Sequence, residues 1–128
     1  MATILVIEDN RQNRYLVTFL LEREGHTVLQ ATNGLEGVAL AEELHPDLIL
    51  LDIQLPDIEG YAVAERLRQA PTLDDTPIVA VTSFAMVGDR ERALAAGCTG
   101  YIEKPIDPMT FLDEVAMHLQ GGSQETPS

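Results

Sequence analysis

The chain has 128 residues, of which 45% are hydrophobic, and its formal net charge at pH 7 is -13. A chain of this length is expected to form one domain. Its single cysteine excludes an internal disulfide and fits a reducing compartment. Its acidity argues against direct binding to nucleic acid, which needs Lys and Arg to meet the phosphates. No apolar run is long enough to span a membrane and the segment MATILVIEDN lacks the basic start of a signal peptide, so we expect a cytoplasmic protein.

Five short apolar runs alternate with five segments of helical periodicity. We predict strands over residues 3–7, 27–31, 47–51, 77–81 and 101–102. A helix is predicted after each strand: Asn10 and Asn33 cap the first two, Gly60 opens the third, the fourth covers about Val87 to Ala96 and ends at Gly97, and Pro108 suits the first turn of the fifth.

The inner faces of these helices are predicted from residues that recur three or four positions apart. They are Leu16, Phe19 and Leu20; Val38, Ala41 and Leu44; Tyr61, Val63, Ala64 and Leu67; and Phe111, Leu112, Val115 and Leu119. Gly37 lies inside a predicted helix, where Gly costs about 1 kcal/mol relative to Ala. We therefore expect the helix to pack closely on the sheet at Gly37.

This alternation predicts an α/β fold with a doubly wound, five-stranded parallel sheet, because parallel neighbours need crossover helices and right-handed crossovers cover both faces. Residues 1–120 form this domain. The tail GGSQETPS, residues 121–128, is small and polar and is predicted to be disordered or the start of a linker.

Carboxylates follow two of the predicted strands. Glu8 and Asp9 come directly after the first strand, and Asp52 follows the third. Because parallel strands end at the same edge of a sheet, these three acids should converge if the two strands are neighbours. Clustered carboxylates repel one another, and Mg2+ is a natural counterion because it prefers oxygen ligands.

Two further polar groups end the other strands at that edge. Thr82 and Ser83 place hydroxyls after the fourth strand, and Lys104 places an ammonium group after the fifth. A cation, a hydroxyl donor, a lysine and a carboxylate can together handle a phosphoryl group, and an aspartate can accept it covalently. No Gly-rich nucleotide-binding loop is present, the three histidines lack metal-binding spacing, and Cys98 is expected to pack in the interior.

The motifs Glu8-Asp9, DIQLPDIEG around Asp52, Thr82-Ser83 and YIEKP, in this order, closely resemble those of a single-domain response-regulator receiver of two-component signalling, over about residues 2–120. The resemblance implies a flavodoxin-like sheet in the order 2-1-3-4-5. It also implies the residue roles. Asp52 is the phosphoacceptor; Asp9, Asp52 and the backbone carbonyl of Gln54 bind Mg2+ directly and Glu8 largely through water; Lys104 contacts the phosphoryl group; Thr82 and Tyr101 are the switch residues; and Lys104–Pro105 is a cis peptide.

The implied function is a phosphorylation-controlled switch that takes a phosphoryl group from a phosphohistidine on a histidine kinase or phosphotransfer protein. Such a protein catalyses only its own phosphorylation and dephosphorylation. We expect Thr82 to move toward the phosphoryl group and Tyr101 to rotate inward, which changes the face formed by residues 87–119. The output is then a protein contact, onward transfer or a fused domain, without nucleic acid or membrane as direct partners.

Departures from the family pattern are Leu55, Glu59 and Glu8, and none of them removes a required group. The resemblance also implies that Gln54 and Phe84 flank the path of attack on the phosphoryl group and so bear on its lifetime. Two alternatives are an aspartyl-phosphate phosphohydrolase, which normally needs an acid at position 54, and a receiver-like binding module without chemistry. Labelling by a small phosphodonor in Mg2+ separates the three.

Overall fold

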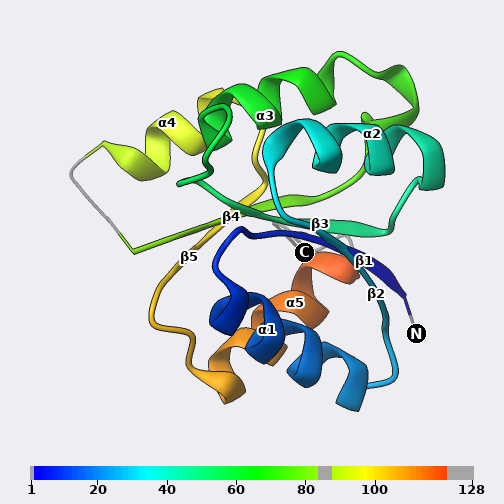
Figure 1. The fold of residues 1–128 in the computed structure, drawn as a ribbon, viewed down its shortest axis with the longest axis vertical. Helices are drawn as coiled ribbons and strands as arrows, with labels where there is room; N and C mark the ends of the chain where they lie inside the picture. The colour runs from blue at the N-terminus through cyan, green and yellow to red at the C-terminus, as the bar shows by residue number, and fades with distance from the viewer. Residues whose placement is uncertain (1, 84–87, 121–128) are drawn as a thin grey trace.

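A computed structural model of the chain describes residues 2–83 and 88–120. Its five strands form one parallel sheet in the order β2-β1-β3-β4-β5 (Figure 1). The strands are β1 (Thr3–Ile7), β2 (Thr27–Ala31), β3 (Leu48–Asp52), β4 (Ile78–Thr82) and β5 (Gly100–Glu103). The predicted fold class and strand order are confirmed.

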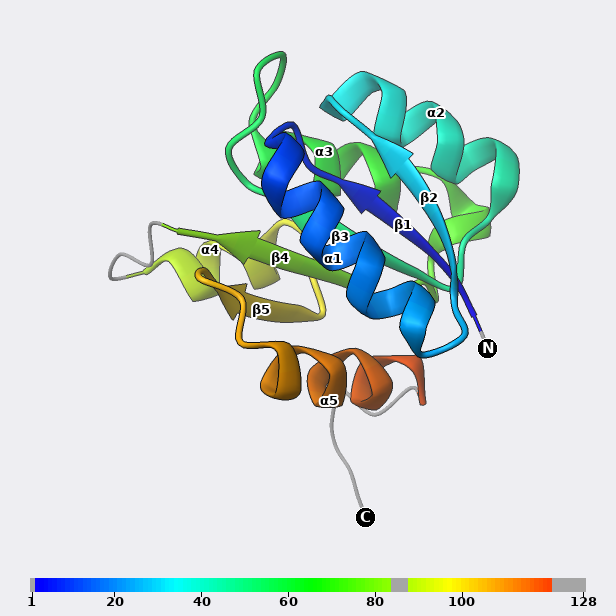
Figure 2. The same cartoon turned by 60° about the horizontal axis from the view of Figure 1, so that its bottom comes forward.

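Helices cover both faces of this sheet. They are α1 (Arg11–Arg23), α2 (Gly34–Leu44), α3 (Gly60–Arg68), α4 (Asp89–Ala95) and α5 (Pro108–Leu119), and a short 3-10 turn, η1, spans Pro71–Leu73. α1 and α5 lie side by side on one face (Figure 2), while α2, α3 and α4 cover the other (Figure 1). Each face has its own apolar core, one built around Leu5, Ile49 and Leu67 and the other around Val6, Leu21 and Phe111.

The predicted caps explain where the helices begin. The side chain of Asn10 accepts a hydrogen bond from the Asn13 N–H group at 2.9 Å, and that of Asn33 accepts one from the Glu36 N–H group at 2.8 Å. Three strands, β3, β4 and β5, end one residue later than predicted, because Asp52 still pairs with Val81 and Thr82 with Glu103 of the neighbouring strands. The predicted start of the fourth helix, Val87, lies outside the described residues.

Two predicted inner-face residues are wrong. Phe19 and Leu44 are each 47% exposed. In α1 the buried residues are Val17, Leu20 and Leu21, and Phe19 lies on the outer side, stacked on Tyr15 with 6.3 Å between the ring centroids. α2 buries Gly34, Gly37 and Ala41 instead of its last residue. Helical spacing alone does not show which of two adjacent apolar stripes turns inward, and a small-residue face is invisible to a search for large apolar side chains.

Gly37 makes the close approach that its position in the sequence predicts. A Cβ atom at Gly37 would lie 2.4 Å from Cδ1 of Ile7, which belongs to β1 directly below the helix. The loop after β3 is also tied to α2, because the carboxylate of Asp57 accepts hydrogen bonds from the N–H groups of Gly34 and Leu35 at 2.8 and 2.9 Å. These bonds lower the pKa of Asp57. α2 therefore supports both strands that carry the predicted site.

A search of the described residues for a helix long and apolar enough to cross a membrane finds none.

Candidate functional site

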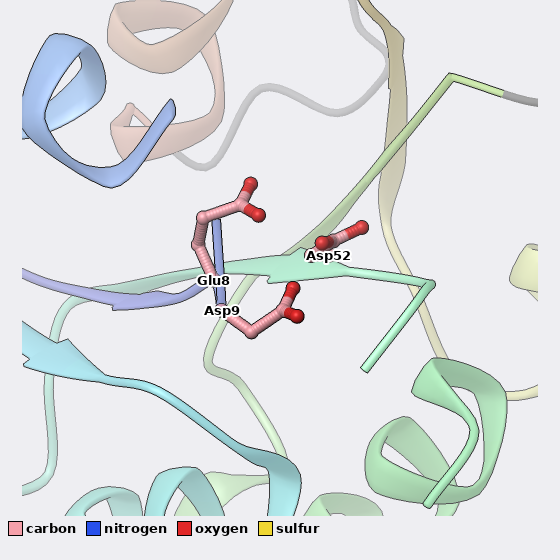
Figure 3. A group of neighbouring side chains, drawn as sticks. All are labelled: Glu8, Asp9 and Asp52. Carbon is pink, nitrogen blue, oxygen red and sulfur yellow. The ribbon is translucent and has the colours of Figure 1, made fainter. Parts of the chain in front are cut away.

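The three predicted acids meet at the carboxyl edge of the sheet, where Figure 3 shows their carboxylate groups gathered at the end of β3. One carboxylate oxygen from each of Glu8, Asp9 and Asp52 lies within 4.8 Å of the others. Glu8 and Asp52 are each only 4% exposed, whereas Asp9 is exposed. The cluster thus has two buried members and one that faces solvent.

Strand register explains this convergence. β1 and β3 are parallel neighbours, and Ile7 pairs with Leu51. The next residue of each chain segment is therefore acidic, Glu8 after β1 and Asp52 at the end of β3. Side chains that follow paired residues lie at the same height along a sheet, so the register itself places these two carboxylates together.

Lys104 supplies the positive charge of the site. Its Nζ atom lies 3.0 Å from Oε1 of Glu8 and 3.6 Å from Oδ2 of Asp52. The backbone N–H group of Lys104 donates to the carbonyl oxygen of Thr82 at 2.8 Å, which fixes the end of β5 against β4. The Lys104–Pro105 peptide bond is cis. One ammonium group therefore lies against the two buried carboxylates of the cluster.

Asp52 is the acid whose ionisation the fold disfavours most clearly. Burial, first of all, and then the hydrogen bond and negative charge of Glu8 raise its pKa to about 7, although a hydrogen bond from the Gln54 N–H group (3.0 Å) and the charge of Lys104 act in the opposite direction. The site therefore holds more negative charge than its lysine offsets. Three carboxylates with oxygens this close are the donor set of a divalent cation that prefers oxygen ligands, so the residues present fit such an ion.

A cleft of about 1070 Å³ opens over the cluster. Its walls include Asn10, Arg11, Gln54, Ser83 and Lys104. The hydroxyl of Ser83 donates to the side-chain oxygen of Gln54 at 3.1 Å, so the two residues form one wall. Phe84, expected to flank the same cleft, lies outside the described residues.

The two predicted switch residues lie away from this cleft. Thr82 is 2% exposed and lines a neighbouring depression of about 410 Å³, with Ile53 and Tyr61, below the loop that follows Asp52. Tyr101 is half-buried and lines a third depression, of about 300 Å³, between β5 and α5. Its hydroxyl oxygen is already buried and has no hydrogen-bond partner in the described part of the chain. The guanidinium of Arg90 lies 6.0 Å from the centre of its ring.

Sequence reasoning missed Arg14. Its Nη1 atom donates to the backbone carbonyl oxygens of Glu8 and Asp9, the two acids that follow β1. The available signal was spacing, because a residue four positions after the Asn10 cap begins the second turn of the helix and can reach back to the strand end. A single arginine on a helix is usually a solvated charge, and nothing else in the sequence marks this one.

A family model and a known relative each match most of this chain. Residues 4–116 match the family model of the response regulator receiver domain. The polar-differentiation response regulator DivK of Brucella ovis is 42% identical over 117 residues, which are 91% of this chain and 95% of the relative.

Solved structures agree. A CheY-like response regulator receiver domain protein from Methanospirillum hungatei superposes with a TM-score of 0.88 at 30% identity, over 94% of this chain and 95% of the other. The receiver domain of a sensor histidine kinase from Pseudomonas aeruginosa, described with a magnesium ion coordinated in its active-site cleft, gives 0.85 at 32% identity, over 94% and 98% of the two chains.

Proposed function

The chain belongs to the response regulator receiver family, whose members act as phosphorylation-controlled signalling switches rather than classical enzymes, and from that premise we propose that Asp52 is the residue that accepts the phosphoryl group. The observation that carries this assignment is the position of Asp52. It is buried at the end of β3, beside the carboxylates of Glu8 and Asp9 and 3.6 Å from the ammonium group of Lys104, in the lining of an open cleft.

The chemical step is a displacement at phosphorus. A carboxylate oxygen of Asp52 bonds to the phosphorus atom while the P–N bond of a donor phosphohistidine breaks, and the imidazole nitrogen leaves with the electron pair and takes a proton. The charge of Lys104 opposes the rise in the pKa of Asp52 and so favours its ionised, nucleophilic form, and the ammonium group then binds a phosphoryl oxygen. When the signal ends, a water oxygen bonds to the same phosphorus, the bond between phosphorus and the Asp52 carboxylate oxygen breaks, and inorganic phosphate leaves the free carboxylate behind. The donor is a histidine kinase or a phosphotransfer protein.

The proposed cofactor is Mg2+, supported by the acidic cluster and by the magnesium-bearing relative. Asp9, Asp52 and the backbone carbonyl of Gln54 would bind it directly and Glu8 mainly through water. A bound divalent cation would neutralise charge on the transferring phosphoryl group. The chain's own part is to hold these ligands at the strand ends, where the neighbouring strand register sets their positions.

The proposed output is a change in the face formed by α4, β5 and α5. The hydroxyl of Thr82 would donate to the new phosphoryl oxygens, and Tyr101 would follow the shift of Thr82 and alter its packing under α4. Because the Tyr101 hydroxyl is already buried, the rearrangement we propose at this residue is a small one. We further propose residues 1–120 as the receiver domain and the cytoplasm as its location, in keeping with the free thiol of Cys98. The predicted tail, residues 121–128, lies outside the described residues.

Labelling with a small acyl phosphate in Mg2+ tests the central assignment. Wild-type protein should gain one phosphoryl group, found on Asp52 by peptide mapping, and Asp52→Asn should gain none while keeping its fold. The matched control is Asp57→Asn, which alters an acid on the same loop that is already bound to the N-terminus of α2. It should be labelled like wild type. Robust labelling of Asp52→Asn at another residue would sink the assignment, and rapid multiple turnover would favour a phosphohydrolase.

A further inference from the structure

The two acids after β1 share one basic partner on α1. Nη1 of Arg14 lies 3.0 Å from the carbonyl oxygen of Glu8 and 3.4 Å from that of Asp9. Both carbonyls follow Ile7, the last residue of β1, and so lie past the paired part of the strand. The guanidinium of Arg14 thus holds the backbone from which two of the three clustered carboxylates extend.

The remaining contacts at this corner restrain Glu8 more than Asp9. The Glu8 N–H group donates to the carbonyl oxygen of Ala31 at 3.0 Å, and the Asn10 N–H group donates to the Glu8 carboxylate at 3.1 Å. Within residues 2–83 and 88–120, Arg14 is the only side chain that hydrogen-bonds to the backbone of Asp9. Asp9 also has an exposed side chain, so its position depends most on this contact.

We propose that Arg14 is a positioning residue of the metal site, which orients the backbone of Glu8 and Asp9 so that the Asp9 carboxylate meets Asp52 around a divalent cation. This inference rests on the proposed function. Groups that orient metal ligands commonly contribute 10- to 100-fold to metal affinity. An arginine suits the task because its planar, rigid fork donates in fixed directions, whereas the lysine ammonium is a mobile point charge.

The charge of Arg14 and its hydrogen bonds to the two carbonyls are expected to have opposite effects on Mg2+ affinity. A guanidinium near the cluster repels a divalent cation, so loss of its charge alone would strengthen Mg2+ binding. Loss of the two carbonyl contacts would weaken it. Arg11 separates the effects, because it lines the cleft over the three carboxylates, is exposed and makes no hydrogen bond to either carbonyl.

The experiment is a magnesium titration of wild type, Arg14→Met, Arg14→Lys and Arg11→Met, followed by amide chemical shifts without any phosphodonor. Arg14→Met should raise the dissociation constant about tenfold, and Arg14→Lys should restore part of the affinity. Arg11→Met should bind Mg2+ as tightly as wild type or more tightly. A dissociation constant for Arg14→Met equal to or below that of wild type overturns the proposal, as does an equal weakening by Arg11→Met.

A second readout separates positioning from a general loss of structure. In labelling by a small acyl phosphate, Arg14→Met should shift the Mg2+ concentration for half-maximal rate upward by the same factor as its dissociation constant, and a lowered maximal rate without that shift would contradict the proposal. If circular dichroism shows Arg14→Met to be unfolded, Arg14→Lys carries the test and should still bind Mg2+ more weakly than wild type. If the wild type binds no Mg2+, both the proposed metal role and this inference are wrong. If the wild type binds Mg2+ and Arg14→Met has the same dissociation constant, only this inference is wrong.

Discussion

The ammonium nitrogen of Lys104 lies 3.0 Å from a carboxylate oxygen of Glu8, and the two side chains are only 12% and 6% exposed. This makes the pair far more buried than the surface pair between Arg92 and Glu59, whose side chains are 56% and 67% exposed. Removal of one member of a buried pair leaves an uncompensated charge, whereas exposed pairs contribute little.

Lys104→Met should therefore destabilise the metal-free protein at pH 8 by about 3 kcal/mol, because Glu8 and Asp52 remain buried without a counter-charge. Arg92→Met is the matched control and should cost about 0.5 kcal/mol. Urea unfolding of the two variants measures both effects. If the two variants lose the same free energy of unfolding, solvent screens the Lys104–Glu8 pair as strongly as it screens the Arg92–Glu59 pair.

The raised pKa of Asp52 predicts a pH dependence of stability. The folded state holds the Asp52 proton up to about pH 7, while the unfolded chain releases it near pH 3.8. Folding therefore binds a proton in that window, and the contribution of this group to stability falls as pH rises through it. Above pH 7 the full penalty for the buried charge is present.

Asp52→Asn removes this penalty. Without metal, the variant should be more stable than wild type at pH 8, by about 2 kcal/mol, and the difference should disappear near pH 4. Urea unfolding at a series of pH values gives the difference directly. A stability difference that stays constant with pH would show that the fold does not disfavour the ionised form of Asp52.

Mg2+ should stabilise the folded protein, because a ligand that binds only the folded state shifts the equilibrium by mass action. At 100 times the dissociation constant the gain is about 2.7 kcal/mol. Asp9→Ala should lose most of this gain, since the carboxylates of Glu8 and Asp52 alone offer fewer ligands. Thermal melts with and without Mg2+ test the prediction, and an equal shift in both proteins would exclude Asp9 as a ligand.

Gly37→Ala should destabilise the protein by about 2 kcal/mol, even though Ala favours a helix by about 1 kcal/mol over Gly. The new methyl group would lie 2.4 to 3.1 Å from three side-chain atoms of Ile7, so α2 must move away from β1. The double variant Gly37→Ala/Ile7→Ala should show a favourable coupling between the two changes when compared with each single variant by urea unfolding. If the stability losses of the two single variants simply add in the double variant, the new methyl group does not contact Ile7.

Tyr101→Ala should separate the chemistry from the signal. Tyr101 does not line the acidic cleft, so the variant should accept a phosphoryl group from a small donor at near wild-type rate. It should lose the phosphorylation-dependent change at α4 and β5, which amide chemical shifts can follow. If these elements respond in the variant as they do in wild type, Tyr101 is only a packing residue.

Much of the site follows from the sequence by itself. The alternation of apolar runs and helical segments predicts a parallel sheet, and in such a sheet residues that follow strands must meet at one edge. That argument places Glu8, Asp9, Asp52 and Lys104 at one edge before any coordinates, while the pairing of β1 with β3 that brings the acids together was expected only from the family resemblance. The close packing at Gly37 could also be predicted from the sequence, because Gly is unfavourable inside a helix and a close approach to the sheet explains its presence there.

Only the tertiary structure determined the orientation of the side chains and the identity of their hydrogen-bond partners. Thr82 and Ser83 are adjacent in sequence, yet Ser83 lines the acidic cleft and Thr82 the depression beside it, because successive side chains of a strand point to opposite sides. Phe19 lies outside although it keeps helical spacing, because α1 turns the stripe of Val17, Leu20 and Leu21 toward the sheet. Arg14 finds two carbonyls at the end of β1 because a long side chain bonds to whatever unpaired groups lie within reach, and only the assembled fold determines which groups those are.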